Sequence, residues 1–547
     1  MASLEPYTPV IVALAGVASH LFFFKIGERD IYPLRYLQAF LLACAVSTIV
    51  KSSYGNLPTK EALGFTAKYA GLYLAGLYGS LITYRLFFNP LNKIPGPYWA
   101  RLSKFNFTFR VAAKLDSCHV LLDLHQRYGK FVRIGPYDIS VTHPDGVEVV
   151  AGIKSKCTKA QWYSQDVPLV SMHTCRDRAQ HDRRRRIWSP AFSDKALRGY
   201  ENRIEKYNDL LIQKLDESNG KSVNMSTWFN LYSFDVMGDL AFGKSYNMLE
   251  SGELHWAIKL LNGGMDPIGF GLPVWFFRVV TAIPGLAADY WRFINYCCEA
   301  LDERIKVQGK MKDPDITHTL IEHFQQGDDT AKRTLMPMLQ GDSRLIIVAG
   351  SDTTAATLVH LFYHLSTQKD LIHRLREELD GLVKKGEKIE HVKIQDAPLL
   401  NGAINETLRL NPPVPSGVFR KTPKEGVMIG NQYIPGNVCI QMPGYVMARD
   451  SDNYPSPYEF IPERFSSRPE LVLHKDAWGP FGTGPYGCIG KNLAYLEIRL
   501  LTANLIRKFD VSLAPGEDGT KLLKETKDHF TLGLGDINMK FTKRTGK

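Results

Sequence analysis

The stretch that decides the fold is 481–490, which reads Phe-Gly-Thr-Gly-Pro-Tyr-Gly-Cys-Ile-Gly and places Cys488 in a glycine-rich loop. Apolar residues then recur at steps of four and three, at Ile489, Leu493, Leu496, Leu500 and Ala503. This period is typical of an amphipathic helix that starts at Cys488, where the helix dipole and free amide groups would lower the pKa of a thiol. The glycines would let the backbone approach a flat ligand closely. By itself the segment fits either a metal thiolate or a small buried hydrophobe, which is the commoner role of a lone cysteine.

A second segment interrupts an apolar helix with polar residues. Residues 345–354 read Leu-Ile-Ile-Val-Ala-Gly-Ser-Asp-Thr-Thr, within a helix expected to run to about Leu365. Glycine costs a helix about 1 kcal/mol relative to alanine, and Asp352 and Thr353 place a carboxyl and a hydroxyl among buried neighbours. Such a local inconsistency often marks a functional site. The alternative is a glycine kink in which Thr353 bonds back to the preceding turn.

Two shorter segments carry pairs of ionisable residues at helical spacing, and a third segment carries a single arginine. His181 and Arg185 share one face of a helix that ends before a proline, although three neighbouring arginines leave the register open. Glu406 and Arg409 share a face of another expected helix, and Arg464 follows in a Pro-Glu-Arg-Phe segment. Each pair alone is a weak signal, because surface ion pairs at this spacing are common.

Strand signals are confined to short segments. A β-hairpin is expected from 130–134 with 138–141, and another from 427–429 with 432–434, around turn residues. Most of the remaining chain has helical periodicity, which predicts a mainly α protein with small β-sheets.

The five motifs occur in the order in which the cytochrome P-450 family carries them, and the chain resembles that family over about residues 90–545. It is most similar to fungal microsomal members that act in secondary metabolism. The resemblance implies the P-450 fold, mainly α with small β-sheets, as a single large haem domain. It also implies haem b with an axial cysteine thiolate as the cofactor.

The resemblance assigns haem-binding roles. Cys488 would ligate the iron. The other haem-binding residues it implies are Phe481, Gly484 and Gly490 in the loop and His181, Arg185 and Arg420 at the propionates. Many family members have arginine where this chain has Tyr486, which carries no charge at neutral pH. We therefore expect His181, Arg185 and Arg420 to bind the propionates more strongly here, arginine being suited to a carboxylate by its planar fork.

The remaining motifs receive catalytic, structural and substrate roles from the same resemblance. Thr353 would hydrogen-bond dioxygen and Asp352 would help to relay protons. Glu406, Arg409 and Arg464 would form a structural triad that fixes the loop approaching the cysteine. The resemblance implies a substrate pocket formed by segments around 161–172, 346–349, 414–419 and 530–534. The residues implied in it are apolar and suit a lipophilic ligand: Val348, Ala349, Val414, Val418, Phe419 and Leu532.

Three apolar segments precede the first motif, at about 10–26, 34–50 and 69–88. A membrane span needs about 20 mostly apolar residues, a length that the third segment reaches easily and the others reach only with flanking residues. The first ten residues contain Glu5 and neither Lys nor Arg, which disfavours a signal peptide.

These segments predict the domain organisation. We expect a membrane anchor at 1–89, a proline-rich hinge at 90–98 and a haem-thiolate catalytic domain at 99–547. The basic residues that follow the third segment are Lys93, Arg101, Lys104 and Arg110. By the positive-inside rule they favour a catalytic domain in the cytosol, at the endoplasmic reticulum membrane.

The charge balance bears on partners. The chain has a formal net charge of +11, yet its basic residues do not form one patch interleaved with aromatics, so we expect no nucleic-acid partner. An excess of positive charge suits an anionic membrane or an acidic partner. The eight cysteines show no zinc-finger or CxxC spacing, which disfavours a disulfide scaffold.

The resemblance implies a monooxygenase that inserts one atom of O2 into a lipophilic small molecule such as a terpenoid or alkaloid. Electrons would come from NADPH through a flavoprotein reductase. One alternative keeps the haem for desaturation or rearrangement of the same class of substrate. Another is a membrane haem-binding protein without turnover. A thiol hydrolase with Cys488 as nucleophile lacks an evident His/Asn arrangement.

Overall fold

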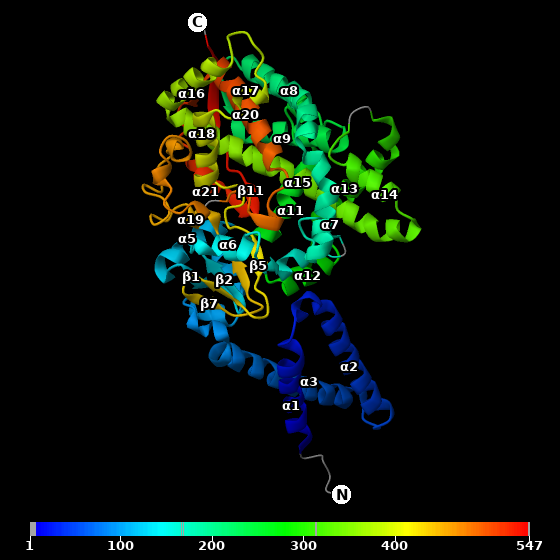
Figure 1. Cartoon of the computed structure of the whole chain (residues 1–547). Coiled ribbons are helices and arrows are strands. Elements are labelled where there is room, and N and C mark those ends of the chain that lie inside the picture. Colours follow the sequence, from blue (N-terminus) through cyan, green and yellow to red (C-terminus); the bar gives the residue numbers. More distant parts are fainter. Residues whose placement is uncertain (1–6, 166, 168, 312–313, 478, 545–547) are drawn as a thin grey trace.

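A computed structural model describes residues 7–165, 167, 169–311, 314–477 and 479–544. Residues 7–88 form a group of helices that projects from the body of the molecule (Figure 1). They are α1 (Thr8–Ser19) with the π-helical turn η2 (His20–Phe24), the short η3 (Arg29–Ile31), α2 (Pro33–Ser53) and α3 (Thr59–Thr83) with η4 (Tyr84–Phe88).

Glycines allow α1 and α3 to pack closely against each other. A Cβ atom at Gly16 would fall on the backbone carbonyl of Tyr73, and one at Gly76 would fall on that of Ala13. Small residues at a helix crossing permit this approach of the two backbones, as they do between membrane helices.

Two helices of the described chain are long and apolar enough to cross a membrane, α2 and α15 (Asp329–Thr367). The apolar window of α15 is 67% buried inside the protein, whereas that of α2 is not buried at all. The α15 helix is therefore a core helix. The α3 helix has the length expected of the third segment, but its most apolar stretch is less apolar than those of α2 and α15, because glycines, tyrosines and Lys68 dilute its apolar character.

The body is mainly helical. Its first helices are α4 (Phe105–Val111), α5 (Ser117–Tyr128), α6 (Asp145–Ala151), α7 (Arg178–Trp188), α8 (Asp194–Glu217), α9 (Met225–Phe242), α10 (Met248–Ser251), α11 (Trp256–Gly269), α12 (Val274–Ala282), α13 (Ala288–Lys306) and α14 (His318–Gln325). After α15 come α16 (Lys369–Leu382), α17 (His391–Ile394), α18 (Pro398–Leu410), α19 (Gly444–Met447), α20 (Lys491–Lys508) and α21 (Thr520–Glu525).

The described residues also form four small sheets. The largest has the order β1-β2-β8-β5-β3, from β1 (Phe131–Arg133), β2 (Asp138–Val141), β8 (Cys439–Gln441), β5 (Phe419–Lys421) and β3 (Thr158–Lys159). Two of the others are the pairs β6 (Val427–Ile429) with β7 (Gln432–Ile434) and β10 (Lys527–His529) with β11 (Thr531–Gly533). In the last, β12 (Asn538–Lys543) lies between β4 (Ser222–Asn224) and β9 (Phe509–Leu513). Both expected hairpins are confirmed, as the antiparallel pairs β1–β2 and β6–β7.

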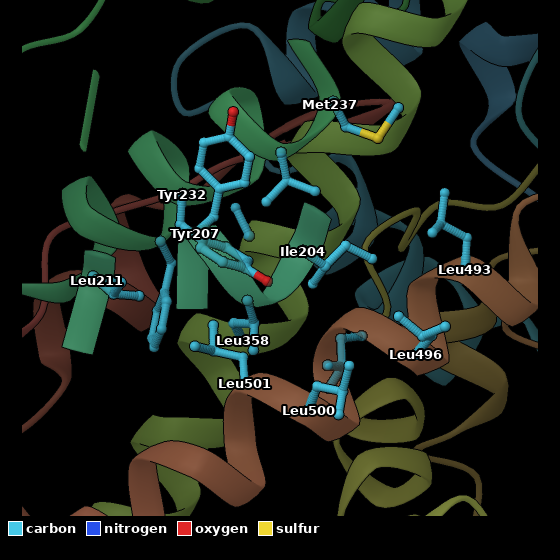
Figure 2. Packing of buried hydrophobic residues seen from close by; sticks show 14 of the residues in the cluster. Ile204, Tyr207, Leu211, Tyr232, Met237, Leu358, Leu493, Leu496, Leu500 and Leu501 are labelled. Atoms are coloured by element: carbon cyan, nitrogen blue, oxygen red, sulfur yellow. The ribbon is translucent and has the colours of Figure 1, made fainter. Parts of the chain in front are cut away.

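The main core surrounds α15, which packs against α9, α13, α18 and α20. Figure 2 shows part of this core, where Ile204 and Leu211 of α8, Tyr232 of α9, Leu358 of α15 and Leu500 of α20 converge. Burial of this apolar surface supplies the main driving force for folding. It also fixes α15 beside α20, the helix that follows the cysteine loop.

Candidate active site

The cysteine loop is a tight turn that only glycine can form at two positions. Gly482 and Gly484 have φ of +66° and +63°, in the left-handed region. A Cβ at Gly484 would fall on the backbone of α6, at Ala151 and Gly152. The Cys488 amide donates to the carbonyl of Phe481 at 2.7 Å. Gly484 thus lets the loop lie against α6. It does not line the cavity described below, so its expected contribution to haem binding would be through the shape of the loop and not through direct contact.

Cys488 precedes α20 rather than starting it, since Gly490 is the N-cap and the helix begins at Lys491. Its side chain is open to the cavity but otherwise enclosed by protein. Burial raises the pKa of the Cys488 thiol, and the amides of Gly490 and Lys491 and the charge of Arg185 lower it by less. The expected lowered pKa is therefore wrong for the free thiol. A bound metal cation would still remove the proton.

A cavity of about 510 Å³ lies between the cysteine loop and α15. Phe481, Cys488 and Gly490 line it from the loop, while Gly350 and Thr353 line it from α15. Most of the lining is apolar, with polar groups gathered at a few points. Such a lining fits a flat, apolar group that carries acidic substituents at one edge.

Thr353 is held by its own helix but keeps an open side toward the cavity. Its Oγ1 donates to the carbonyl oxygen of Ala349 at 2.8 Å, which is the back-bond expected from a glycine kink. This bond uses the hydroxyl proton, and the oxygen lone pairs remain able to accept a hydrogen bond from a group in the cavity.

Asp352 lies one hydrogen bond behind the cavity wall and does not line the cavity. Its Oδ2 accepts from Oγ1 of Thr531 at 3.3 Å, and Thr531 does line the cavity. Burial raises the pKa of Asp352 to about 7, against a smaller lowering by the Thr531 hydrogen bond. The carboxyl can therefore gain and lose a proton near neutral pH.

The structure resolves the register among the four consecutive arginines of α7. His181 and Arg185 both line the cavity, and Arg185 Nη1 donates to the carbonyl of Gly487 at 2.6 Å. Arg184 instead lies in the core, where its Nε donates to Oδ2 of Asp342 at 2.6 Å. Sequence patterns did not predict this buried ion pair, because its two partners lie 158 residues apart.

The protein environment of His181 favours its neutral form. Burial and the nearby cation Lys159 lower its pKa to about 4, against the raising effect of Asp182. Its ring meets the edge of Tyr486, with the ring centroids 4.7 Å apart. A neutral imidazole can offer one N–H at most to a propionate, and the part of His181 in offsetting the missing positive charge stays a prediction.

Three basic side chains lie close to the aromatic ring of Tyr486. Lys159 Nζ and Arg420 Cζ each lie 4.9 Å from the ring centroid, and Arg178 Cζ lies 5.4 Å from it. These distances are within the range of cation–π attraction. The position that lacks an arginine thus holds three cations from β3, β5 and α7 around an aromatic ring.

Hydrogen-bond donors without a partner lie at this edge of the cavity, where a carboxylate could accept from them. The Tyr486 hydroxyl and Arg420 Nε are buried and make no hydrogen bond within the part of the chain that the structure describes. Buried polar atoms normally have partners. Arg420 Nη1 donates to the Tyr163 hydroxyl at 3.2 Å. Residues on this edge would bind the propionates of a haem whose iron is held by Cys488.

Lys159 was not predicted from the sequence. It lines the cavity and donates to the carbonyl oxygen of Met172 at 2.8 Å. Burial and the Arg420 charge lower its pKa to about 7. A single lysine in a two-residue strand gives no local signal, because its position depends on the pairing of β3 with β5.

The expected triad is a buried ion cluster. Glu406 accepts from Arg409 at 2.7 and 2.8 Å and from Arg464 at 3.1 Å, and these side chains are 0% exposed. Arg409 also donates to the carbonyl oxygens of Ala448 and Pro457. The cluster ties α18 to the chain that leads toward the cysteine loop, and a buried charge network of this kind tolerates no missing partner.

The predicted substrate residues divide into two groups. Val348, Ala349, Val414 and Val418 line the cavity, whereas Phe419 and Leu532 are not among its described lining residues. Phe419 instead borders a second cavity of about 30 Å³. The wall of the main cavity also includes aromatic side chains from two of the segments expected to form the pocket, Trp162 and Tyr163 from 161–172 and Phe530 from 530–534.

Glu497 is a further buried acid that sequence patterns did not reveal. It lies on α20, is 1% exposed and lines the cavity. Its Oε2 has no hydrogen-bond partner in the described chain, and burial raises its pKa to about 8. Glu497 is therefore protonated at neutral pH, a state that avoids the cost of an unpaired buried charge.

Comparison with known proteins shows the family of the chain. The family model described as Cytochrome P450 matches residues 95–541. The chain is 48% identical to cytochrome P450 monooxygenase lcsK of Purpureocillium lilacinum, over 97% of each chain. It is 40% identical to cytochrome P450 monooxygenase notG' of Aspergillus versicolor over 98% of each, and 38% identical to tryprostatin B 6-hydroxylase of Aspergillus fumigatus over 97% of this chain and 95% of the relative. The chain therefore belongs to the cytochrome P450 family, whose members are haem-thiolate monooxygenases.

Proposed function

We propose that this protein is a membrane-bound monooxygenase that inserts one atom of O2 into a lipophilic small molecule. Electrons would come from an NADPH-dependent flavoprotein reductase. The observation that carries the proposal is that Cys488 and Thr353 face one largely apolar cavity from opposite elements, the cysteine loop and α15. This arrangement leaves room for a cofactor on the thiol and a substrate under the helix.

Each residue at the site would then have a defined task. Haem, when bound, supplies the activation of dioxygen. Cys488 would hold its iron, and the propionates would be bound by Arg185, Arg420 and Lys159 with the Tyr486 hydroxyl. The rigid loop fixes the position of the thiol, because backbone hydrogen bonds and contact with α6 leave it little freedom.

Proton delivery would use a pair of hydrogen-bonded groups. Asp352 can exchange a proton at Oδ2 near neutral pH, and the Thr531 hydroxyl that binds it reaches the cavity. Thr353 offers oxygen lone pairs at the same wall. A general acid is most effective when its pKa lies near the working pH, which Asp352 satisfies.

The substrate we propose is a lipophilic secondary metabolite, such as a terpenoid or alkaloid. The apolar side chains of Val348, Val414 and Val418 support this class, since burial of apolar surface would supply the binding energy. One relative is named as the 6-hydroxylase of tryprostatin B, which supports hydroxylation as the outcome here.

We further propose an N-terminal membrane anchor at 1–89, a hinge at 90–98 and a catalytic domain at 99–547 that faces the cytosol at the endoplasmic reticulum. The length and exposure of α2 support an anchor in contact with membrane lipid. Basic residues after the third apolar segment support the cytosolic orientation.

The test is reconstitution of microsomes that contain this protein and a cytochrome P450 reductase. The expected result is a product one oxygen atom heavier than the added precursor, formed only with both NADPH and O2. Asp352→Asn, which leaves Cys488 intact, should lower the rate, and omission of the reductase should abolish product. Turnover without NADPH, reductase or O2 would contradict the proposal.

A further inference from the structure

A half-buried carboxylate joins the loop between α1 and α2 to the catalytic body. Glu28 Oε1 accepts from Arg176 Nη2 at 2.6 Å and from Lys421 Nζ at 2.8 Å. The three side chains are only 19–22% exposed. Two residues on, Asp30 Oδ2 accepts from Nε2 of Gln161 at 3.3 Å. One short loop thus reaches partners that lie 131 to 393 residues away in the chain.

Arg176 carries this attachment to the wall of the cavity. Its Nε donates to the carbonyl of Lys159 at 3.1 Å, and its Nη1 donates to Oγ of Ser164 at 3.0 Å. Ser164 ends the 3-10 helix η7 (Gln161–Ser164). All three nitrogens of this guanidinium therefore donate a hydrogen bond, to the N-terminal loop, β3 and η7.

The element held in this way contributes two aromatic residues to the cavity wall. Trp162 and Tyr163, both within η7, line the cavity. The Trp162 ring also stacks on Phe530, another residue of the wall, with the ring centroids 4.9 Å apart. A displacement of η7 would therefore change the shape of the cavity directly.

A second attachment reaches the same element from α12. Arg278 of α12 donates from Nη1 to the carbonyl of Ser164 at 2.8 Å. The α12 helix also packs against η3 and α2, and Figure 1 shows it beside the loop that joins α1 and α2. The wall segment η7 is thus held between the N-terminal helices and α12.

We infer that Glu28 is a positioning residue for ligand binding, which fixes the cavity wall at η7 by holding Arg176 and Lys421. Without its carboxylate the two cations would face each other in a partly buried site with no anion between them. The Arg176 guanidinium would then lose its hydrogen bonds to β3 and η7, and the cavity wall at η7 would become more mobile. A less preorganised wall lowers the affinity for a bulky ligand, and the loss of affinity appears mainly as a faster dissociation rate.

The test uses the full-length holoenzyme with two imidazole probes of different size, and it rests on the proposed function in that both probes bind the haem iron. Clotrimazole is bulky enough to meet the wall, whereas imidazole is not. In Glu28→Gln we expect clotrimazole to dissociate about fivefold faster and imidazole to dissociate at an unchanged rate. Glu61→Gln is the matched control, because Glu61 is an exposed acid on the same set of N-terminal helices.

Amide hydrogen exchange supplies a second readout that does not depend on haem. The peptide 159–165 should exchange faster in Glu28→Gln than in the native protein or Glu61→Gln. Arg176→Lys should behave like Glu28→Gln, because an ammonium cannot bridge three separate partners in one plane. If Glu28→Gln folds poorly, Arg176→Lys still tests the inference.

The outcomes separate the two proposals. Unchanged clotrimazole dissociation and unchanged exchange in a well-folded Glu28→Gln would overturn the inference. A native protein that forms no thiolate-type carbon monoxide band would instead overturn the proposed function, and hydrogen exchange would still decide the role of Glu28.

Discussion

Arg185 Nη1 donates to the carbonyl oxygen of Gly487 at 2.6 Å, and so joins α7 to the residue immediately before Cys488. The guanidinium lies on the cavity wall while it braces the loop. One side chain can therefore both hold the cysteine in place and pair with an acidic edge of the cofactor.

Replacement of this arginine should release haem. In Arg185→Ala we expect the haem content per protein to fall several-fold, because both the loop hydrogen bond and a charged partner for a propionate are lost. Pyridine haemochrome assay of purified protein measures this. Arg183→Ala is the control, since Arg183 lies in the same helix but is exposed. Full haem retention in Arg185→Ala would show that the assignment is wrong.

Tyr486 should act through both its ring and its hydroxyl. Tyr486→Phe keeps the surface on which Lys159, Arg178 and Arg420 lie, and loses only the buried hydroxyl. Tyr486→Ala loses both, and each cation–π contact contributes about 0.5–2 kcal/mol. We expect haem transfer to apomyoglobin to be fastest from Tyr486→Ala and intermediate from Tyr486→Phe. Equal rates for the two variants would exclude a contribution of the ring.

Asp352 should affect proton delivery and not ligand binding. In Asp352→Asn the side chain keeps its shape but cannot exchange a proton, so product formation should slow by about 10²-fold. The dissociation constant of clotrimazole should stay unchanged, because Asp352 does not line the cavity. A solvent deuterium isotope effect larger than that of the native enzyme would support the assignment. An unchanged rate with normal coupling would refute it.

Glu497 should make stability depend on pH with a definite sign. Its pKa is about 8 in the folded protein, against an ordinary value of 4.5. The folded state therefore binds the proton more tightly, and this contribution is complete below pH 4.5 and is lost as the pH rises to about 8. We expect the thermal midpoint to fall across this window by less in Glu497→Gln than in the native protein. The exposed Glu525→Gln serves as control; identical pH profiles for all three would contradict the burial of an unpaired acid.

Local patterns predicted the local structure well. The helix expected to carry Glu406 and Arg409 is α18, and the two hairpins form where turn residues separate short β-rich segments. The apolar residues at steps of four and three after Cys488 are buried in α20 at Leu493, Leu496 and Leu500. These features depend on periodicity within a few turns, which the sequence records directly.

Features that depend on distant segments were beyond such patterns. Lys159 reaches the cavity only because β3 pairs with β5, more than 250 residues later. The ion pairs of Arg184 with Asp342 and of Glu28 with Lys421 form because whole helices and loops pack against each other. The pKa of Cys488 was mispredicted for a related reason, since burial by the surrounding body outweighs the nearby helix amides.

The central claim is that Cys488 provides the axial thiolate of a bound haem. The most direct measurement is the difference spectrum of the ferrous carbon monoxide adduct of the native protein and of Cys488→Ser. The native protein should show the red-shifted Soret band of a thiolate-ligated haem, and the variant should lose that band or the haem itself. A red-shifted band that persists in Cys488→Ser would contradict the claim.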